Sequence, residues 1–426
     1  MSRDQLFVAI KKIIPKRIYA NLQPLYHFGL AFLAALFYGF PARKMIVVGV
    51  TGTKGKTTVV ELLHAILAAA GRKTASLSSL RFKIGEKEFI NDLKMTMPGR
   101  FFVQKFLHQA GQAGCKYAII EVTSEGIKQF RHRFIGFDLA VMTNMAPEHL
   151  ESHGSFEKYL RAKLDLFWRL PQQGTAIINK DDYQAKRFLA ATGAHKVFYG
   201  EDGILISGKN FILKNLELEE GITFDLNNYQ INSLLTGKFN LYNILAAIAA
   251  GLALHIPLVK IAEAVVKVSG IPGRMEIIQK NPFKVIVDYA HTPDSLRQAY
   301  ETLKNSRLIC VLGSAGGGRD KWKRPEMGKI AAEFCQEIII TNEDPYDEDP
   351  QKIINEVASE ISQKAQVINI LDRREAIRKA LQRAQPNDTV IITGKGAEPW
   401  LMGAGGKKIP WDDREVAREE LKQIKK

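Results

Sequence analysis

Residues 47–58 read VVGVTGTKGKTT, a glycine-rich and hydroxyl-rich loop that constrains the fold more than any other part of the chain. The preceding residues 45–50 are apolar and rich in valine, which is typical of a buried parallel strand. After residue 58 apolar side chains recur at helical spacing as far as Gly71, a residue type that often ends helices. The sequence therefore predicts a strand, a glycine loop and a helix.

A loop of this kind binds anions, because the free N–H groups and the dipole of the helix point into it. Its lysine can reach terminal phosphates and its hydroxyls can bind Mg²⁺. Val50 replaces the first glycine of the usual nucleotide-binding pattern, so the loop is a variant. A plain glycine turn is the alternative, but the strand and helix context favours ATP or GTP. The predicted nucleotide contacts here are Gly52, Thr53, Gly55, Lys56, Thr57 and Thr58.

The size and charge of the chain limit the number of domains and the kinds of partner that we expect. A chain of 426 residues exceeds what one hydrophobic core usually supports, so we expect at least two domains. The net charge of +15 is spread along the sequence without a basic motif of the RNA-binding kind. We therefore expect no nucleic acid partner, and an acidic nucleotide-linked substrate with anionic lipid accounts for the charge.

Three cysteines, Cys115, Cys310 and Cys335, lie far apart and lack metal-ligand spacing. This usage predicts a reducing cytoplasm and no zinc site.

The N-terminal 44 residues combine an apolar stretch with basic flanks. Residues 24–40 are short for a membrane span, which needs about 20 apolar residues. Three interpretations stay open: a helix docked on the protein core, an interfacial helix and a true span. Export is not expected, since no small-residue cleavage site precedes the glycine loop.

Two further apolar runs end in polar residues that suit a nucleotide site. The run at residues 117–122 has an acid, Glu121, at its end. The run through Met142 is followed by His149. Side chains at the carboxyl ends of parallel strands lie beside the ligand in α/β sheets. Lys163 lies in an amphipathic stretch, where a solvated lysine is the simpler interpretation.

As a set, these segments resemble the Mur ligase family, and specifically the members that form muramoyl tripeptides. The resemblance runs from about residue 45 to the C-terminus. The motifs that carry it are TGTKGKTT, EVTSEG, TNMAPEHLESHG, YLRAKLDLF, GKFNLYN, GIPGRME, VDYAHTPDS, GSAGGGRDKWKRPEMG, NEDPYDEDP, ITGKGAE and DDREVA.

The resemblance implies ATP and Mg²⁺ as cofactors. It implies that Thr57, Glu121 and His149 bind metal and that Lys163 is carbamylated. A bare lysine cannot ligate Mg²⁺, which takes oxygen donors. The implied catalytic residues are Lys56, Glu121, His149 and Lys163.

The rest of the chain divides at SGIPGRME, where we place the hinge. Before it, short strands at residues 205–235 precede a long apolar helix. Asn240 and Asn243 at its start resemble adenine-side residues of the family, although helix caps are an equal alternative. After it, strands alternate with helices. By resemblance, Arg274 and Asp288 clamp ATP, His291 lies near the ribose, and closure expels water.

The predicted fold class is therefore α/β. An N-terminal apolar and basic helical segment (residues 1–44) precedes a P-loop-type ATPase domain with a mostly parallel sheet (residues 45–270). A doubly wound, Rossmann-like α/β domain follows (residues 271–426).

Several substrate motifs depart from the family pattern. Where the family has T-T-P, this chain has Thr96-Met97-Pro98, and where the family has S-S-H it has Thr123-Ser124-Glu125. Tyr346 replaces the arginine of the family motif D-N-P-R. That arginine would grip the second carboxylate of diaminopimelate, so the remaining acids suggest an ammonium instead. The first 44 residues are also too few for the usual uridine-nucleotide domain. The predicted substrate residues are Thr96, Ser124, Arg319, Glu343, Asp344, Tyr346, Gly394 and Glu398.

The sequence thus predicts an ATP-dependent carboxylate-amine ligase that adds an amino acid to a muramoyl peptide precursor through an acyl phosphate. The alternatives are an amide ligase of the same fold on a folylpolyglutamate-type or amino-acid-polymer substrate, and a nucleotide-binding membrane scaffold. We expect a cytoplasmic monomer with membrane-surface contact through residues 11–44.

Overall fold

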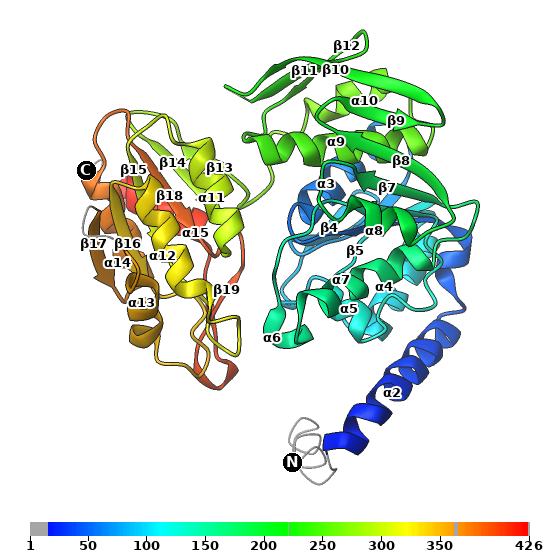
Figure 1. Ribbon diagram of the computed structural model, residues 1–426, viewed down its shortest axis with the longest axis horizontal. Helices are drawn as coiled ribbons and strands as arrows, with labels where there is room; N and C mark the ends of the chain where they lie inside the picture. Colours follow the sequence, from blue (N-terminus) through cyan, green and yellow to red (C-terminus); the bar gives the residue numbers. More distant parts are fainter. Residues whose placement is uncertain (1–15, 220, 362–364, 425–426) are drawn as a thin grey trace.

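The computed structural model describes residues 16–219, 221–361 and 365–424. Two lobes, each built on its own β-sheet, make up most of the molecule (Figure 1). Strands β1 to β12 form the first sheet, β13 to β18 form the second, and β19 (Trp400–Met402) pairs with β20 (Lys408–Pro410). The predicted α/β class is confirmed. The division at residue 270 stays a prediction, although it falls between the last strand of one sheet and the first strand of the other.

The first sheet has six parallel strands at its centre, in the order β8-β7-β6-β1-β5-β2, with antiparallel strands at both edges. Short, valine-rich and isoleucine-rich strands suit this central position because helices cover both of their faces. The strands are β1 (Ile46–Thr51), β2 (Thr74–Leu77), β3 (Arg81–Ile84), β4 (Lys87–Ile90), β5 (Tyr117–Glu121), β6 (Leu139–Met142), β7 (Thr175–Asn179), β8 (His195–Gly200), β9 (Gly203–Ile206), β10 (Lys209–Glu217), β11 (Ile222–Leu226) and β12 (Tyr229–Ser233).

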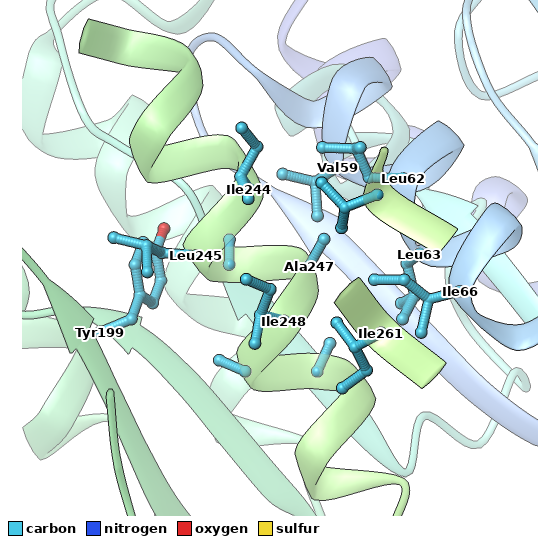
Figure 2. Packing of buried hydrophobic residues seen from close by; sticks show 14 of the residues in the cluster. Val59, Leu62, Leu63, Ile66, Tyr199, Ile244, Leu245, Ala247, Ile248 and Ile261 are labelled. Atoms are coloured by element: carbon cyan, nitrogen blue, oxygen red, sulfur yellow. The ribbon is translucent and has the colours of Figure 1, made fainter. Parts of the chain in front are cut away.

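One face of this sheet is covered by α3 (Lys56–Ala69), α9 (Lys238–Ala253) and α10 (Leu258–Val265). Figure 2 shows their interlocking side chains, which come from α3, from α9 and, at Ile261, from α10. Gly251 lets the three helices approach closely, since a Cβ there would lie 3.0 Å from Ile261 and 3.1 Å from Ile66. The helix that starts at the glycine loop is thereby anchored in the core.

The other face is covered by α4 (Arg100–Gln112), α5 (Ser124–Lys128), α7 (Phe156–Trp168) and α8 (Ala185–Ala190). A short helix, α6 (Leu150–His153), follows His149, and η1 (Pro41–Lys44) precedes β1. The predicted strand, loop and helix around residues 47–58 are confirmed, as are the strands that end near Glu121 and Met142.

The second lobe is doubly wound, as predicted, with parallel order β14-β18-β15-β16-β17 and β13 antiparallel at one edge. Its strands are β13 (Glu276–Gln279), β14 (Lys284–Asp288), β15 (Leu308–Leu312), β16 (Glu337–Thr341), β17 (Gln366–Ile370) and β18 (Thr389–Thr393). Helices α11 (Pro293–Thr302), α12 (Lys323–Phe334) and α13 (Pro350–Ala358) cover one face. Helices α14 (Arg373–Arg383) and α15 (Asp413–Ile424) cover the other, and η2 (Ala404–Gly406) lies between β19 and β20.

One expectation about the cysteines was wrong. Cys310 of β15 and Cys335, which follows α12, form a disulfide, whereas the sequence predicted a reducing cytoplasm, where thiols stay reduced. The chain returns from α12 to β16, which pairs with β15, so residues 25 apart in sequence meet in space. Cys115 is free and buried.

The N-terminal segment forms α2 (Lys16–Phe37), which projects from the first lobe (Figure 1). Among the described residues, no helix is both long enough and apolar enough to cross a membrane. Ala31, Ala34 and Ala35 are buried against the protein, whereas one outward stripe of large apolar side chains stays exposed. The helix is therefore docked on the protein along one face and open along another, and the interfacial interpretation stays a prediction.

Candidate active site

A cavity of about 300 Å³ lies where the two lobes meet, and both lobes line it. Most of the predicted site residues reach it. They are Thr53, Gly55, Lys56, Thr57, Thr58, Thr96, Glu121, His149, Asn240, Asn243, Arg274, Asp288, His291, Arg319, Glu343, Asp344, Tyr346 and Glu398. The cavity lining does not include Gly52, Ser124, Lys163 or Gly394.

The glycine loop opens directly into the first turn of α3. Gly55 is the N-cap residue at φ 82°, and no side chain caps the helix among the described residues. The first N–H groups of α3 are therefore available to an anion. Lys56 folds back over the loop, where its Nζ donates to the carbonyl oxygens of Gly52 at 3.0 Å and Thr53 at 2.9 Å.

Asn243 explains why residue 55 must be glycine. A Cβ at residue 55 would lie 2.1 Å from the Asn243 Oδ1. Asn243 Nδ2 donates to Asn240 Oδ1, and Asn240 Nδ2 donates to the Thr236 carbonyl. The helix-cap alternative for these two asparagines was wrong, because Gly237 is the N-cap of α9 and both side chains bond elsewhere.

Oxygen donors gather beside the loop. Thr57 Oγ1 donates to Glu121 Oε2 at 3.0 Å, and Ser79 Oγ lies 3.1 Å from both carboxylate oxygens. Thr96 Oγ1 is 3.0 Å from Ser79 Oγ. Within the described ranges no three His, Cys, Asp or Glu side chains form a metal cluster. One carboxylate with hydroxyls nevertheless suits Mg²⁺, which takes oxygen ligands and shares them with phosphates and water.

Lys163 lies beneath the loop rather than in the cavity. It is 1% exposed, and its Nζ donates to the Gly52 carbonyl at 2.6 Å and lies 4.9 Å from the centre of the Tyr159 ring. Burial lowers the pKa of Lys163 well below its usual value, and the nearby Lys56 lowers it further. The sequence alternative of a solvated lysine was therefore wrong.

His149 occupies a strained position next to this lysine. Its backbone has φ 57°, a left-handed conformation that few non-glycine residues adopt. Burial lowers the pKa of His149 to about 4, so the imidazole is neutral at pH 7 and can serve as a metal ligand. The ring centres of His149 and Tyr159 are 6.1 Å apart.

A charged network that the sequence did not predict connects the lobes. Lys54 Nζ donates to Glu148 Oε1 at 2.9 Å, and His291 Nε2 lies 3.3 Å from Lys54 Nζ and 3.4 Å from Glu148. Burial favours protonation of Glu148, but Lys54 and His291 hold its pKa well below the usual range. Lys54 and Glu148 are each next to a predicted site residue in the sequence. That position was the one sequence feature that could have identified them.

The prediction that these acids bind an ammonium group needs correction, because two of them are already paired with lysines. Asp344 and Glu398 accept hydrogen bonds from both Lys94 and Lys395, at 2.5 to 2.9 Å. Glu343 differs: its Oε2 is buried and has no hydrogen-bond partner among the described residues. Burial and the neighbouring Asp344 raise the pKa of Glu343.

The other predicted residues of the second lobe support the cavity wall. Arg274 stacks on the Tyr289 ring at 4.2 Å, and Asp288 accepts from the N–H groups of Met275 and Ala290. Arg319 lines the cavity on the side of Tyr346.

Ser124 and Gly394, the two predicted substrate residues outside the cavity lining, lie next to residues that do line it. Ser124 is buried at the start of α5, next to the lining residue Thr123. Gly394 has φ 111°, and a Cβ there would lie 2.7 Å from Glu343 Oε2.

Comparison with known proteins identifies the family. The Mur ligase middle domain matches residues 50–251, and the Mur ligase glutamate ligase domain matches residues 273–396. The chain is a Mur ligase. As a member of this family it is an ATP-dependent, ADP-forming amide ligase.

Individual relatives agree with this assignment. A UDP-N-acetylmuramoyl-L-alanyl-D-glutamate--2,6-diaminopimelate ligase from Trichormus variabilis is 39% identical, over 93% of this chain and 81% of that protein. A solved structure of a ligase with the same name is 30% identical, with a TM-score of 0.60 over 90% of this chain and 79% of that one. Folylpolyglutamate synthase from Mycobacterium tuberculosis, at 18% identity, shares the fold with a TM-score of 0.71 over 85% of this chain and 91% of that chain.

The contact between Gly55 and Asn243 generates the first prediction. We expect Gly55→Ala to weaken ATP binding roughly tenfold or more, because a left-handed alanine costs about 1–2 kcal/mol and its Cβ displaces the asparagine. Calorimetric titration with a non-hydrolysable ATP analogue measures the change. Gly111→Ala is the matched control, since Gly111 lies in α4 with open space around it. Equal affinity in the two variants would contradict the prediction.

Proposed function

We propose that this Mur ligase joins an amino acid to the terminal carboxylate of a muramoyl dipeptide in peptidoglycan synthesis. The observation that carries the proposal is the cavity between the lobes, where a phosphate-binding loop, an oxygen cluster and the substrate-side residues of the second lobe converge. The name of the Trichormus relative, a ligase acting on a muramoyl dipeptide, supports the acceptor class.

The chemistry follows from charge. The acceptor carboxylate attacks the γ-phosphate of ATP to give an acyl phosphate and ADP, and the amine then displaces phosphate to form the amide. Two anions must meet in the first step, so the free N–H groups of α3 and the ammonium of Lys56 hold the phosphates and offset their charge. Magnesium, held by Thr57 and Glu121 when bound, supplies further positive charge. Lys54, Glu148 and His291 keep the second lobe against the loop and exclude water.

We propose that Lys163 acts as a carbamate. Its depressed pKa favours the neutral form of the amine, and a neutral amine adds CO₂ to give a carbamate and one proton. The carbamate supplies oxygen ligands beside His149, whereas the bare amine cannot bind Mg²⁺. Burial under the loop keeps the modified side chain in place.

The second prediction tests this role. We expect Lys163→Ala to abolish ligation and a short carboxylate such as acetate to restore part of it, by replacing the missing oxygen ligands. Phosphate release measures activity, and a carbamate signal after addition of ¹³C-labelled bicarbonate identifies the modification directly. Full activity of the alanine variant without added carboxylate would rule out the proposed role.

We further propose that the amine substrate is a basic amino acid such as lysine or ornithine. Glu343 is buried at the cavity wall with one carboxylate oxygen unpaired, which suits a distal ammonium. Tyr346 stands where the family arginine would bind the second carboxylate of diaminopimelate. Arg319 lines the cavity and interacts with Tyr346, which makes it a candidate to replace that arginine.

The third prediction concerns this choice. With a muramoyl dipeptide acceptor and a panel of amino acids, we expect phosphate release with lysine or ornithine, and we expect Glu343→Gln to raise their KM roughly tenfold. Release with diaminopimelate alone would overturn the proposal, and loss of that activity in Arg319→Gln would then assign the second carboxylate to Arg319. A folate acceptor in the same panel tests the alternative substrate class.

We also propose that the exposed stripe of α2 rests on the inner face of an anionic membrane. The stripe includes Leu25, Leu33 and Phe37, which are 69%, 52% and 75% exposed. Basic residues precede it in sequence and follow it at Arg43 and Lys44, and each contributes about 1 kcal/mol near an anionic surface. This placement implies a cytoplasmic enzyme with a peripheral contact. The monomeric state stays a prediction.

The fourth prediction is that the full chain floats with vesicles containing phosphatidylglycerol at low salt, and that Leu25→Glu with Leu33→Glu abolishes flotation. Val259→Glu, a change at an exposed apolar residue of α10, is the control and should leave flotation unchanged. Equal flotation of all three forms would refute membrane contact through this stripe.

A further inference from the structure

Two lysines share the same two carboxylate oxygens at the wall of the cavity. Lys94 Nζ donates to Asp344 Oδ2 at 2.9 Å and to Glu398 Oε2 at 2.6 Å. Lys395 Nζ donates to the same two oxygens, at 2.9 Å and 2.5 Å. Lys94 belongs to the loop between β4 and α4 of the first lobe, whereas the other three residues belong to the second lobe. One cation of this group therefore comes from the opposite lobe.

The second lobe pairs both acids by itself. Lys395 is fully buried and also contacts Asp344 Oδ1. The Tyr289 hydroxyl donates to Glu398 Oε1 at 2.8 Å, and the Met402 N–H donates to Asp344 Oδ1 at 2.8 Å. Burial opposes the charge of Lys395, but Glu398 and Asp344 raise its pKa. Both carboxylates therefore stay paired when the lysine of the first lobe leaves.

Lys94 reaches the acids from the cavity side. It lines the cavity together with Asp344 and Glu398, whereas Lys395 lies outside the cavity lining. Burial and the charge of Lys395 lower the pKa of Lys94, so the second ammonium is held less firmly than the first. The Lys94 backbone has φ 54°, a left-handed conformation that is uncommon outside glycine and that is concentrated at functional sites. Lys94 thus has the position of an exchangeable cation.

The same acids lie where the amine substrate is expected. Glu343, which has one oxygen without a hydrogen-bond partner among the described residues, precedes Asp344 in sequence and lines the same cavity. After burial, the charge of Asp344 is the largest cause of the raised pKa of Glu343, so the two carboxylates act on one region. An ammonium that approaches Glu343 therefore meets the like charge of Lys94.

We propose that Lys94 is a specificity-determining residue whose ammonium holds Asp344 and Glu398 until the ammonium of the amine substrate displaces it. The proposal rests on the class of amine substrate given above. An amino acid with a cationic side chain can take over the hydrogen bonds that Lys94 gives up. An amino acid with an apolar side chain would leave them unmade, so the lysine favours cationic substrates.

The backbone of this loop is fixed by other contacts. The Asp92 carbonyl accepts from Trp400 Nε1 at 3.2 Å and from Lys408 Nζ at 3.4 Å, both in the second lobe. Asn91 Nδ2 donates to the Met95 carbonyl at 3.0 Å. Displacement of the lysine therefore requires movement of its side chain alone, and a substitution there leaves the loop in place.

The fifth prediction compares amine substrates in the full-length enzyme. We expect Lys94→Met to lower the KM for lysine or ornithine roughly tenfold, because the competing ammonium is gone. Activity with alanine should not improve, and the KM for ATP should not change. Lys94→Gln, which stays polar but has no charge, should act in the same direction. Lys105→Met, at an exposed lysine of α4, is the matched control and should leave all values unaltered.

A purely structural contact between the lobes gives a different result. Its loss would raise the KM for ATP and for the amine together. That outcome, or an unchanged KM for lysine and ornithine in both Lys94 variants, would overturn the proposal.

A binding measurement separates this proposal from the proposed function, because it needs no acceptor. In calorimetric titrations of the enzyme loaded with a non-hydrolysable ATP analogue, L-lysine should bind Lys94→Met roughly tenfold more tightly than the wild type. L-alanine should not distinguish the two forms. If this difference holds but no muramoyl acceptor reacts, the role of Lys94 stands and the proposed function fails. Equal lysine affinity in the two forms, or no lysine binding to either, refutes the role of Lys94 even if ligation proceeds.

Discussion

The loop between β1 and α3 must leave the first N–H groups of α3 open to phosphate while its own carbonyl groups and the Lys54 N–H are satisfied by protein, and the surrounding structure meets that constraint. Thr143 Oγ1 donates to the Lys54 carbonyl at 2.6 Å, and the Lys54 N–H donates to Asn144 Oδ1 at 2.9 Å. Lys163 donates to the Gly52 carbonyl from below. A Cβ at Gly52 would lie 1.8 Å from Thr143 Oγ1, so the end of β6 holds the loop by close contact. Because β6 pairs with β1 in the sheet, the strand order places the end of β6 beside the loop.

Charged side chains hold the two lobes together above the loop. The lobes meet through Lys54, Glu148 and His291, and again through Lys94, which bonds Asp344 and Glu398. Asp320 adds a third contact, since its carboxylate accepts from the N–H groups of Leu150 and Glu151 at the start of α6. Each contact joins a residue beside the loop to the second lobe. The cavity is therefore complete only where both lobes contribute to it, as expected for chemistry that must exclude water.

Much of the site was predictable because its residues belong to local patterns. Strand ends identified Glu121, and the glycine loop identified Lys56 and Thr57, since these signals depend on neighbours in sequence. Long-range pairing was not predictable. Lys94 and Asp344 are 250 residues apart, so the sequence left Asp344 and Glu398 as free acids where the fold pairs them with lysines. The disulfide between Cys310 and Cys335 was missed for the same reason.

The sequence by itself determined the α/β class, the anion-binding loop and the resemblance to Mur ligases, because periodicity and motif spacing are properties of short segments. Only the tertiary structure decided that Lys163 is buried with a depressed pKa, that Glu343 is the acid with an unpaired oxygen, and that His27 contacts Arg100. Burial and charge pairing depend on which distant side chains share a small volume. That information arises when the chain folds, since the cost of burying a charge depends on every group around it.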